Sequence, residues 1–180
     1  STCNEVLLTD YLLKTATDDK ARAAVINHYL DGFKGTVFRQ TQFAEFEHEI
    51  HAADEAGTAL TADFLSERYG ELNKKYYGDQ LTFDPDIANE WARIPHFYYN
   101  FYVFQYATGF AAATAFADAI LKEGQPAVDR YLGFLSAGSS DWPIDVLKKA
   151  GVDMTEAATI VRALDAFERS LDEMEALMGL

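Results

Sequence analysis

Apolar residues recur at helical spacing through almost the whole of this chain, and glycines and prolines interrupt the recurrence. An α-helix turns once in about 3.6 residues, so apolar residues three and four positions apart line one of its faces. No segment shows the strict alternation of apolar and polar residues that is typical of a half-buried strand. The pattern therefore predicts an all-α fold, a multi-helix bundle.

Capping residues and glycines divide this pattern into separate helices. Asp18 or Asp19 and then Thr61 precede apolar runs, and their side-chain oxygens can accept hydrogen bonds from the first free amides of a helix. Gly35 and Gly78 are expected to interrupt or end helices. The expected helices span residues 5–15, 19–33, 36–55, 62–77, 87–93, 95–122, 126–138, 143–150 and 155–177, the last capped by Thr155. Nothing resembling a linker separates them, so we expect one helical domain over residues 1–180.

The charge and the lone cysteine exclude several classes of protein. A net charge of −14 disfavours nucleic acids and anionic membranes as partners, because both require a cationic face. The most apolar stretch, residues 97–120, carries too many polar side chains for a membrane span. Cys3 is alone, so it forms no intrachain disulfide, and we expect a small buried side chain in a cytoplasmic protein. The start has no signal peptide and no Met, which suggests a mature product or a fragment.

The segment from Pro95 to Tyr106 carries the densest pattern of aromatic residues. On a helix the plain rings share one face: Phe97, Phe101 and Phe104. The imidazole and the phenols share another: His96, Tyr99, Tyr102 and Tyr106. The first face suits a dry core, whereas the second offers hydrogen-bond donors that could line a polar cleft and stabilise an oxyanion. Periodicity also allows a packed helix whose tyrosine hydroxyls bond to backbone, and both interpretations stay open here.

A run of acidic residues and histidines between Glu45 and His51 resembles metal-binding motifs without completing one. The H-E-x-x-H motif needs two histidines four residues apart, but His48 and His51 are only three apart. Glu45 and His48 have the Glu-x-x-His spacing of a di-iron bundle, but no second copy exists. A charged, solvated helix face with two exposed histidines is therefore the favoured interpretation.

Three segments in one order resemble oligoendopeptidase F, a family of thimet-oligopeptidase-like zinc metallopeptidases. The run from Arg93 to Gly109 resembles the signature helix of that family. The segment Ala137–Pro143 with Leu147–Met154, and the segment Arg39–Glu47, are similar to it as well. A related family of helical zinc carboxypeptidases shares part of this pattern, so endopeptidase activity is favoured by the closer resemblance only.

The resemblance implies an all-α enzyme that hydrolyses short peptides, with this chain forming one wall of its zincin-like channel. It implies a zinc ion held by two histidines of an H-E-x-x-H helix and by a glutamate on a following helix. Residues 1–5 match the run that ends in this glutamate, so Glu5 is the implied third zinc ligand. The implied substrate-contacting and oxyanion-stabilising residues are, in order of preference, His96, Tyr99, Tyr102 and Tyr106.

The chain departs from that family because it contains no H-E-x-x-H motif. We therefore expect a C-terminal fragment of a larger peptidase, zinc-free and inactive alone, because catalytic zinc sites need about three protein ligands. The expected partners are short peptides and the N-terminal part of the same enzyme, and self-association is plausible if core surface is exposed. The alternatives are a non-catalytic helical interaction module and, less favoured, a di-iron bundle.

Overall fold

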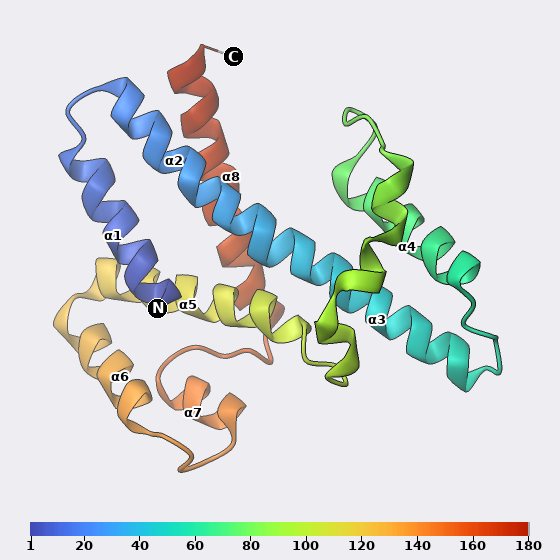
Figure 1. Cartoon of the computed structure of the whole chain (residues 1–180). Coiled ribbons are helices and arrows are strands. Elements are labelled where there is room, and N and C mark those ends of the chain that lie inside the picture. Colours follow the sequence, from blue (N-terminus) through green and yellow to red (C-terminus); the bar gives the residue numbers. More distant parts are fainter. Residues whose placement is uncertain (180) are drawn as a thin grey trace. The chain divides into compact units, whose positions relative to one another are not determined.

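The computed structural model describes residues 1–179, and within that range it contains helices and turns without a strand (Figure 1). The all-α prediction is confirmed. Eight α-helices are described: α1 (Thr2–Thr15), α2 (Asp19–Phe33), α3 (Arg39–Glu55), α4 (Ala62–Tyr77), α5 (Phe104–Glu123), α6 (Gln125–Ser136), α7 (Pro143–Lys149) and α8 (Ala157–Met178). A π-helical turn, η1 (Lys34–Phe38), leads from α2 to α3, and two 3-10 helices, η2 (Pro85–Arg93) and η3 (Pro95–Tyr98), precede α5.

Local side-chain chemistry sets several of these boundaries as expected. Asp18 caps α2 by accepting a hydrogen bond from the Ala21 amide at 2.8 Å. The Thr61 hydroxyl oxygen accepts the Phe64 amide at 3.2 Å at the start of α4. That helix ends at Gly78, whose φ of 71° lies in the left-handed region that favours glycine.

One predicted boundary is right and another is wrong. α2 ends at Phe33, as expected, and a π-helical turn then carries the chain through Gly35 into α3. Thr155 does not cap the last helix, which begins at Ala157. Its hydroxyl donates instead to the Asp153 carboxylate at 2.6 Å, a local bond that competes with capping.

The chain is divided into two compact units, each with its own core. The first comprises residues 1–34 with the chain from Thr108 onward, and the second comprises Gly35–Ala107. In the first, Phe33 is fully buried against the rings of Tyr29, Phe110 and Phe167. Cys3 is also buried there, as expected. The single domain that the sequence suggested stays a prediction.

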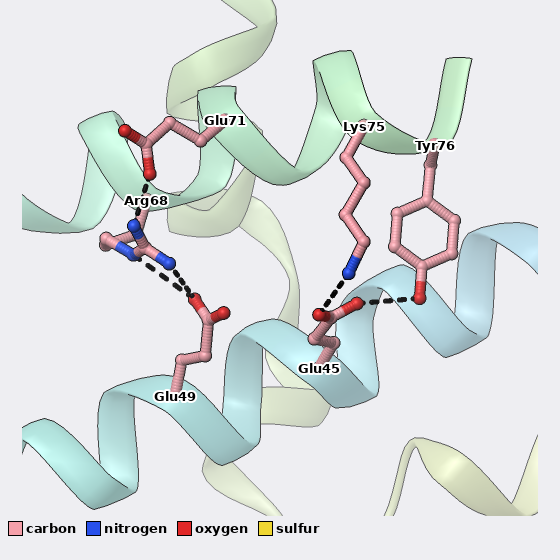
Figure 2. Close-up of polar contacts among 6 residues, drawn as sticks. All are labelled: Glu45, Glu49, Arg68, Glu71, Lys75 and Tyr76. Atoms are coloured by element: carbon pink, nitrogen blue, oxygen red, sulfur yellow. Dashed lines mark hydrogen bonds and ion pairs between the residues drawn. The ribbon is translucent and has the colours of Figure 1, made fainter. Parts of the chain in front are cut away.

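The second unit is organised around α3 and α4, which lie side by side (Figure 1). Its core combines rings and aliphatic side chains from α3, α4 and the segment before α5: Phe43, Phe46, Tyr69, Leu72, Ile94 and Val103. Beside this core, ion pairs join the two helices (Figure 2). Arg68 donates to Glu49 at 3.0 Å, and Glu45 accepts from Lys75 at 2.5 Å and from Tyr76 at 2.8 Å.

No helix within the described range is both long enough and apolar enough to cross a bilayer. This holds for α5, which contains much of the apolar stretch at residues 97–120.

Candidate active-site cluster

The aromatic segment before α5 is not the continuous helix that the sequence predicted. η3 ends at Tyr98, and α5 begins only at Phe104. Between them, Asn100 and Phe101 have φ values of 48° and 60°, and successive left-handed residues end a right-handed helix. We call residues 99–103 the turn.

Packing explains why the turn replaces a helix. Val103 is fully buried in the core of the second unit, and Phe97 packs against the same core. Residues six apart on a straight helix point in directions about 120° apart, so a helix would not direct both side chains into one cluster. Phe101 and Phe104 remain 42% and 48% exposed. The predicted dry face of three phenylalanines is therefore wrong for two of them.

The four side chains predicted to line a substrate channel gather into one cluster, which we call the His–Tyr cluster: His96, Tyr99, Tyr102 and Tyr106. Tyr102 stacks on His96, with ring centroids 6.0 Å apart and an interplanar angle of 15°. Tyr99 and Tyr106 present edges to the same imidazole at 6.0 and 5.7 Å. The Tyr106 hydroxyl oxygen lies 3.4 Å from His96 Nε2 and 3.5 Å from the Tyr102 hydroxyl.

The phenols of the His–Tyr cluster are accessible to solvent. Tyr99 is 59% exposed, while Tyr102 and Tyr106 are 39% and 38% exposed. The hydrogen bond with Tyr102 raises the pKa of the Tyr106 phenol, so this hydroxyl keeps its proton near neutral pH. A protonated phenol can donate a hydrogen bond to a carbonyl oxygen or to an oxyanion.

Glu5, the implied zinc ligand, lies in the other unit. It is an exposed residue of α1, and its carboxylate accepts a hydrogen bond from the Ser1 hydroxyl at 2.6 Å. It lines a groove of about 370 Å³ between α1 and α2, together with His28, Leu8 and Leu12. Its approach to the His–Tyr cluster stays a prediction.

A complete zinc site is not among the residues described. Within residues 1–179, no three His, Cys, Asp or Glu side chains lie close enough together to hold a metal ion. Glu5 fits a zinc site only as one ligand of a set whose other members come from elsewhere. The possible di-iron ligand Glu45 is already bonded to Lys75 and Tyr76.

Two buried carboxylates in the second unit were missed by the sequence analysis. Glu47 is 1% exposed on α3, and Glu90 is 7% exposed on η2. Helical spacing could have revealed Glu47, because it follows Phe43 by four residues and precedes Ile50 by three, and so shares their buried face. Of the two histidines expected to be exposed, His48 is exposed, whereas His51 is half-buried against the Phe101 ring.

Glu90 is held by three donors and precedes the His–Tyr cluster in sequence by a few residues. Tyr69 donates to its Oε2 at 2.6 Å, and Arg39 donates to its Oε1 at 2.5 Å beside an ion pair with Arg93. Burial opposes ionisation, but the hydrogen bonds from Tyr69 and Arg39 outweigh it and lower the pKa of Glu90 below its usual value. Glu90 thereby fixes η2 to α3 and α4, and η2 leads directly to Pro95.

The His–Tyr cluster gathers one imidazole and three phenols, all of them groups that can donate hydrogen bonds, at one place. Residues 1–166 match the family described as Peptidase family M3. The chain therefore belongs to peptidase family M3.

Individual relatives are similar over nearly the whole of this chain. It is 60% identical to oligopeptidase PepF of Bacillus subtilis and 57% identical to group B oligopeptidase PepB of Streptococcus agalactiae, with 99% of this chain covered in each case. The crystal structure of oligoendopeptidase-F from Enterococcus faecium matches with a TM-score of 0.96 at 60% identity, over 99% of this chain. A crystal structure of a putative peptidase from Chlamydophila abortus matches with a TM-score of 0.90 at 44% identity, over 98% of this chain.

These relatives are much longer than the chain. The match spans 27% of the Bacillus subtilis protein and 30% of the Streptococcus agalactiae protein. It spans 34% and 30% of the two crystallised chains.

Proposed function

We propose that this chain is the C-terminal part of a zinc-dependent oligopeptidase that hydrolyses peptide bonds in short peptides. The proposal is carried by the His–Tyr cluster, whose donors are gathered at one place and remain accessible to a ligand. Membership of peptidase family M3 and the similarity to oligopeptidases support peptide hydrolysis. A cytoplasmic location accords with the single buried cysteine.

In this proposal Glu5 is one zinc ligand, and the remaining ligands come from the N-terminal part of the parent enzyme. The bound metal would polarise a water molecule and the scissile carbonyl. The chain alone is then zinc-free and inactive, because one carboxylate does not complete a zinc site. Metal analysis and a peptide-cleavage assay on the purified 180-residue chain test this, and stoichiometric zinc or measurable cleavage would contradict it.

The His–Tyr cluster stabilises the oxyanion that develops on the scissile carbonyl. Tyr106 has one hydroxyl hydrogen. When it donates this hydrogen to His96 Nε2 and not to Tyr102, Nδ1 carries the imidazole N–H and can donate a hydrogen bond to the oxyanion. The stacked Tyr102 ring limits rotation of the imidazole, so the donor is oriented before substrate arrives. One well-placed donor of this kind contributes about 3 kcal/mol to the transition state.

Replacing His96 in the full-length parent tests this role. We expect His96→Ala to lower kcat by about 100-fold or more, because a lost oxyanion donor acts on the transition state more than on substrate binding. KM should change less than kcat. His48→Ala is the matched control, since His48 is an exposed histidine outside the cluster. An unchanged kcat in His96→Ala would remove His96 from the mechanism.

A peptide substrate with an amidated C-terminus separates the two peptidase classes that the sequence left open. An endopeptidase cleaves such a peptide internally, whereas a carboxypeptidase requires the free terminal carboxylate. We expect internal cleavage by the parent enzyme, and mass spectrometry of the products reads out the cleaved bond directly.

The groove on α1 and α2 is the surface that we propose for contact with the rest of the parent. Leu8 and Leu12 line it and are 54% and 41% exposed, which leaves apolar area in water when the chain is alone. The same area would promote self-association of the isolated chain. Sedimentation equilibrium tests this: we expect Leu8→Asp to shift the isolated chain toward monomer, and a concentration-independent monomer in the unsubstituted chain would contradict it.

A further inference from the structure

We propose that Glu47 is a positioning residue that holds the turn at residues 99–103 in the left-handed conformation on which the His–Tyr cluster depends. The proposal gives α3 a part in the hydrolysis proposed above, and to that extent it rests on the proposed function. It also assigns a role to the Glu- and His-rich run of α3, which forms no metal site among the described residues.

The tether is a single hydrogen bond between elements far apart in sequence. Glu47 lies on α3 with 1% of its surface exposed, and its Oε1 accepts the backbone N–H of Phe101 at 2.8 Å. One helical turn further along α3, the His51 ring lies 4.4 Å from the Phe101 ring, centroid to centroid, at an angle of 37°. Glu47 therefore holds the backbone of Phe101, while His51 packs against one side of its ring.

The turn needs such a tether because its backbone is unfavourable. Asn100 and Phe101 both have positive φ, which costs a non-glycine residue about 1–2 kcal/mol. A buried carboxylate is itself unfavourable unless it accepts hydrogen bonds. The Glu47–Phe101 bond offsets part of both costs, because the carboxylate gains a donor and the turn gains a contact.

The local sequence prefers a different structure, which is why the tether matters. The spacing of residues 95–106 is that of a helix. Two contacts oppose it: the packing of Phe97 and Val103 on one core, and the hydrogen bond from the Phe101 amide to Glu47. In a continuous helix, His96 and Tyr106 would be about 15 Å apart along the axis, because each residue adds about 1.5 Å. In the structure, Tyr106 Oη lies 3.4 Å from His96 Nε2. The break at residues 100 and 101 is thus what brings the imidazole and this phenol together.

α3 also contacts the segment beside His96, where the His–Tyr cluster begins. The Phe97 ring lies 5.8 Å from Phe43 and 5.2 Å from Phe46, both on α3. Two residues between His96 and Tyr102 are therefore held against α3. Phe97 contacts that helix through its ring, and Phe101 contacts it through its backbone amide.

Variants of Glu47 in the full-length parent test the tether. Glu47→Gln keeps the acceptor oxygen and the side-chain length, so we expect kcat within about threefold of the unsubstituted enzyme. Glu47→Leu keeps the volume and removes the acceptor, and we expect kcat to fall by about tenfold or more with little change in KM, because displaced catalytic groups lose rate. Gln42→Leu is the matched control, since it also replaces a buried polar residue of α3 by leucine. Within residues 1–179, the Gln42 Nε2 has no hydrogen-bond partner to lose.

Two further readouts separate positioning from general damage. A structure of Glu47→Leu, by crystallography or NMR, should show Asn100 and Phe101 with negative φ. Adding Asn100→Gly to Glu47→Leu should restore part of the lost kcat, because glycine adopts positive φ without a steric cost. Should Glu47→Leu fail to fold, Glu47→Asp takes its place, since it keeps the charge but shortens the acceptor by one methylene; it should then lower kcat.

The inference fails if Glu47→Leu, or Glu47→Asp in its place, keeps positive φ at both residues and full kcat. It also fails if Glu47→Gln loses as much kcat as Glu47→Leu, since the charge and not the tether would then be required. Failure of the proposed function is distinguishable, because it appears as an unchanged kcat in His96→Ala. The φ values in the Glu47 variants report on the tether in either case.

Discussion

Removing one hydroxyl from Tyr69 should destabilise the second unit much more than the same change at Tyr76. Tyr69 is fully buried on α4 and donates to Glu90 Oε2 at 2.6 Å. Tyr76 lies on the same helix and donates to Glu45 Oε2 at 2.8 Å, where the carboxylate side chain is 30% exposed. Tyr69→Phe and Tyr76→Phe each remove a hydroxyl that donates to a glutamate carboxylate. The two sites differ mainly in how deeply this hydrogen bond is buried.

The expected magnitudes follow from what replaces each lost hydrogen bond. Glu90 keeps its two arginines at Oε1, but its Oε2 loses a charged hydrogen bond inside the protein, which costs about 2 kcal/mol in the free energy of unfolding. At Glu45, water can take the place of the phenol, and the cost should be about 0.5 kcal/mol.

Urea denaturation followed by tryptophan fluorescence measures this difference. The chain has two tryptophans, and Trp91 lies in η2 with its indole N–H bonded to Ser66 at 3.1 Å. A Trp142→Phe background removes the other, which is 76% exposed, so that the signal reports on the second unit. Equal effects of the Tyr69 and Tyr76 substitutions, or a larger effect at Tyr76, would refute the argument from burial.

The same variant should respond differently to acid. The pKa of Glu90 is lowered in the folded protein, so its contribution to stability is present above the usual glutamate pKa and is lost as the pH falls through the folded value. Loss of the Tyr69 hydroxyl raises the folded pKa of Glu90 toward the unfolded value, so acidification should remove less of the free energy of unfolding from Tyr69→Phe than from the unsubstituted protein. An equal loss on acidification in both proteins would contradict the assigned hydrogen bond.

Three further predictions concern the first unit. Phe33→Ala should lower the free energy of unfolding by about 3–5 kcal/mol in thermal denaturation, because the ring is 0% exposed. Gly151→Ala should lower the free energy of unfolding by about 1–2 kcal/mol, since its φ is 91° and a Cβ would lie 3.3 Å from Arg130 Nε. Gly133→Ala, inside α6, should raise the free energy of unfolding by about 0.5–1 kcal/mol. An NMR titration should place the pKa of Asp153 at about 2, because its hydrogen bond with Lys148 is the largest of the effects that lower it. Lys148→Met should raise the pKa of Asp153.

Three helix boundaries fixed by neighbours in sequence were predicted correctly. The caps at Asp18 and Thr61 and the end of α4 at Gly78 depend on contacts within four residues, and all three stand where expected. Cys3 was expected to be buried because a cysteine without a partner behaves as a small apolar side chain.

Features fixed by distant residues were not predictable from spacing. The turn at residues 99–103 contacts distant residues: the Phe101 amide donates to Glu47, 54 residues earlier, and Val103 is buried in the core of the second unit. Glu90 depends on Tyr69, 21 residues before it, and on Arg39, 51 residues before it. Helical spacing grouped His96 with the three tyrosines, and these rings do lie together. They lie together because the helix is broken between Tyr98 and Phe104, whereas the prediction assumed a continuous helix.

The Glu- and His-rich run of α3 is explained by the neighbours of that helix. Glu45 and Glu49 face α4 and pair with its cations, as Figure 2 shows. Phe46 is fully buried in the core, and Glu47 and His51 contact the turn through Phe101. Residues three and four positions apart on a helix face the same neighbouring element. Polar residues of α3 that contact one element therefore have the same spacing as metal ligands on a helix. Such spacing on a single helix therefore indicates a metal site only when a second element supplies further ligands.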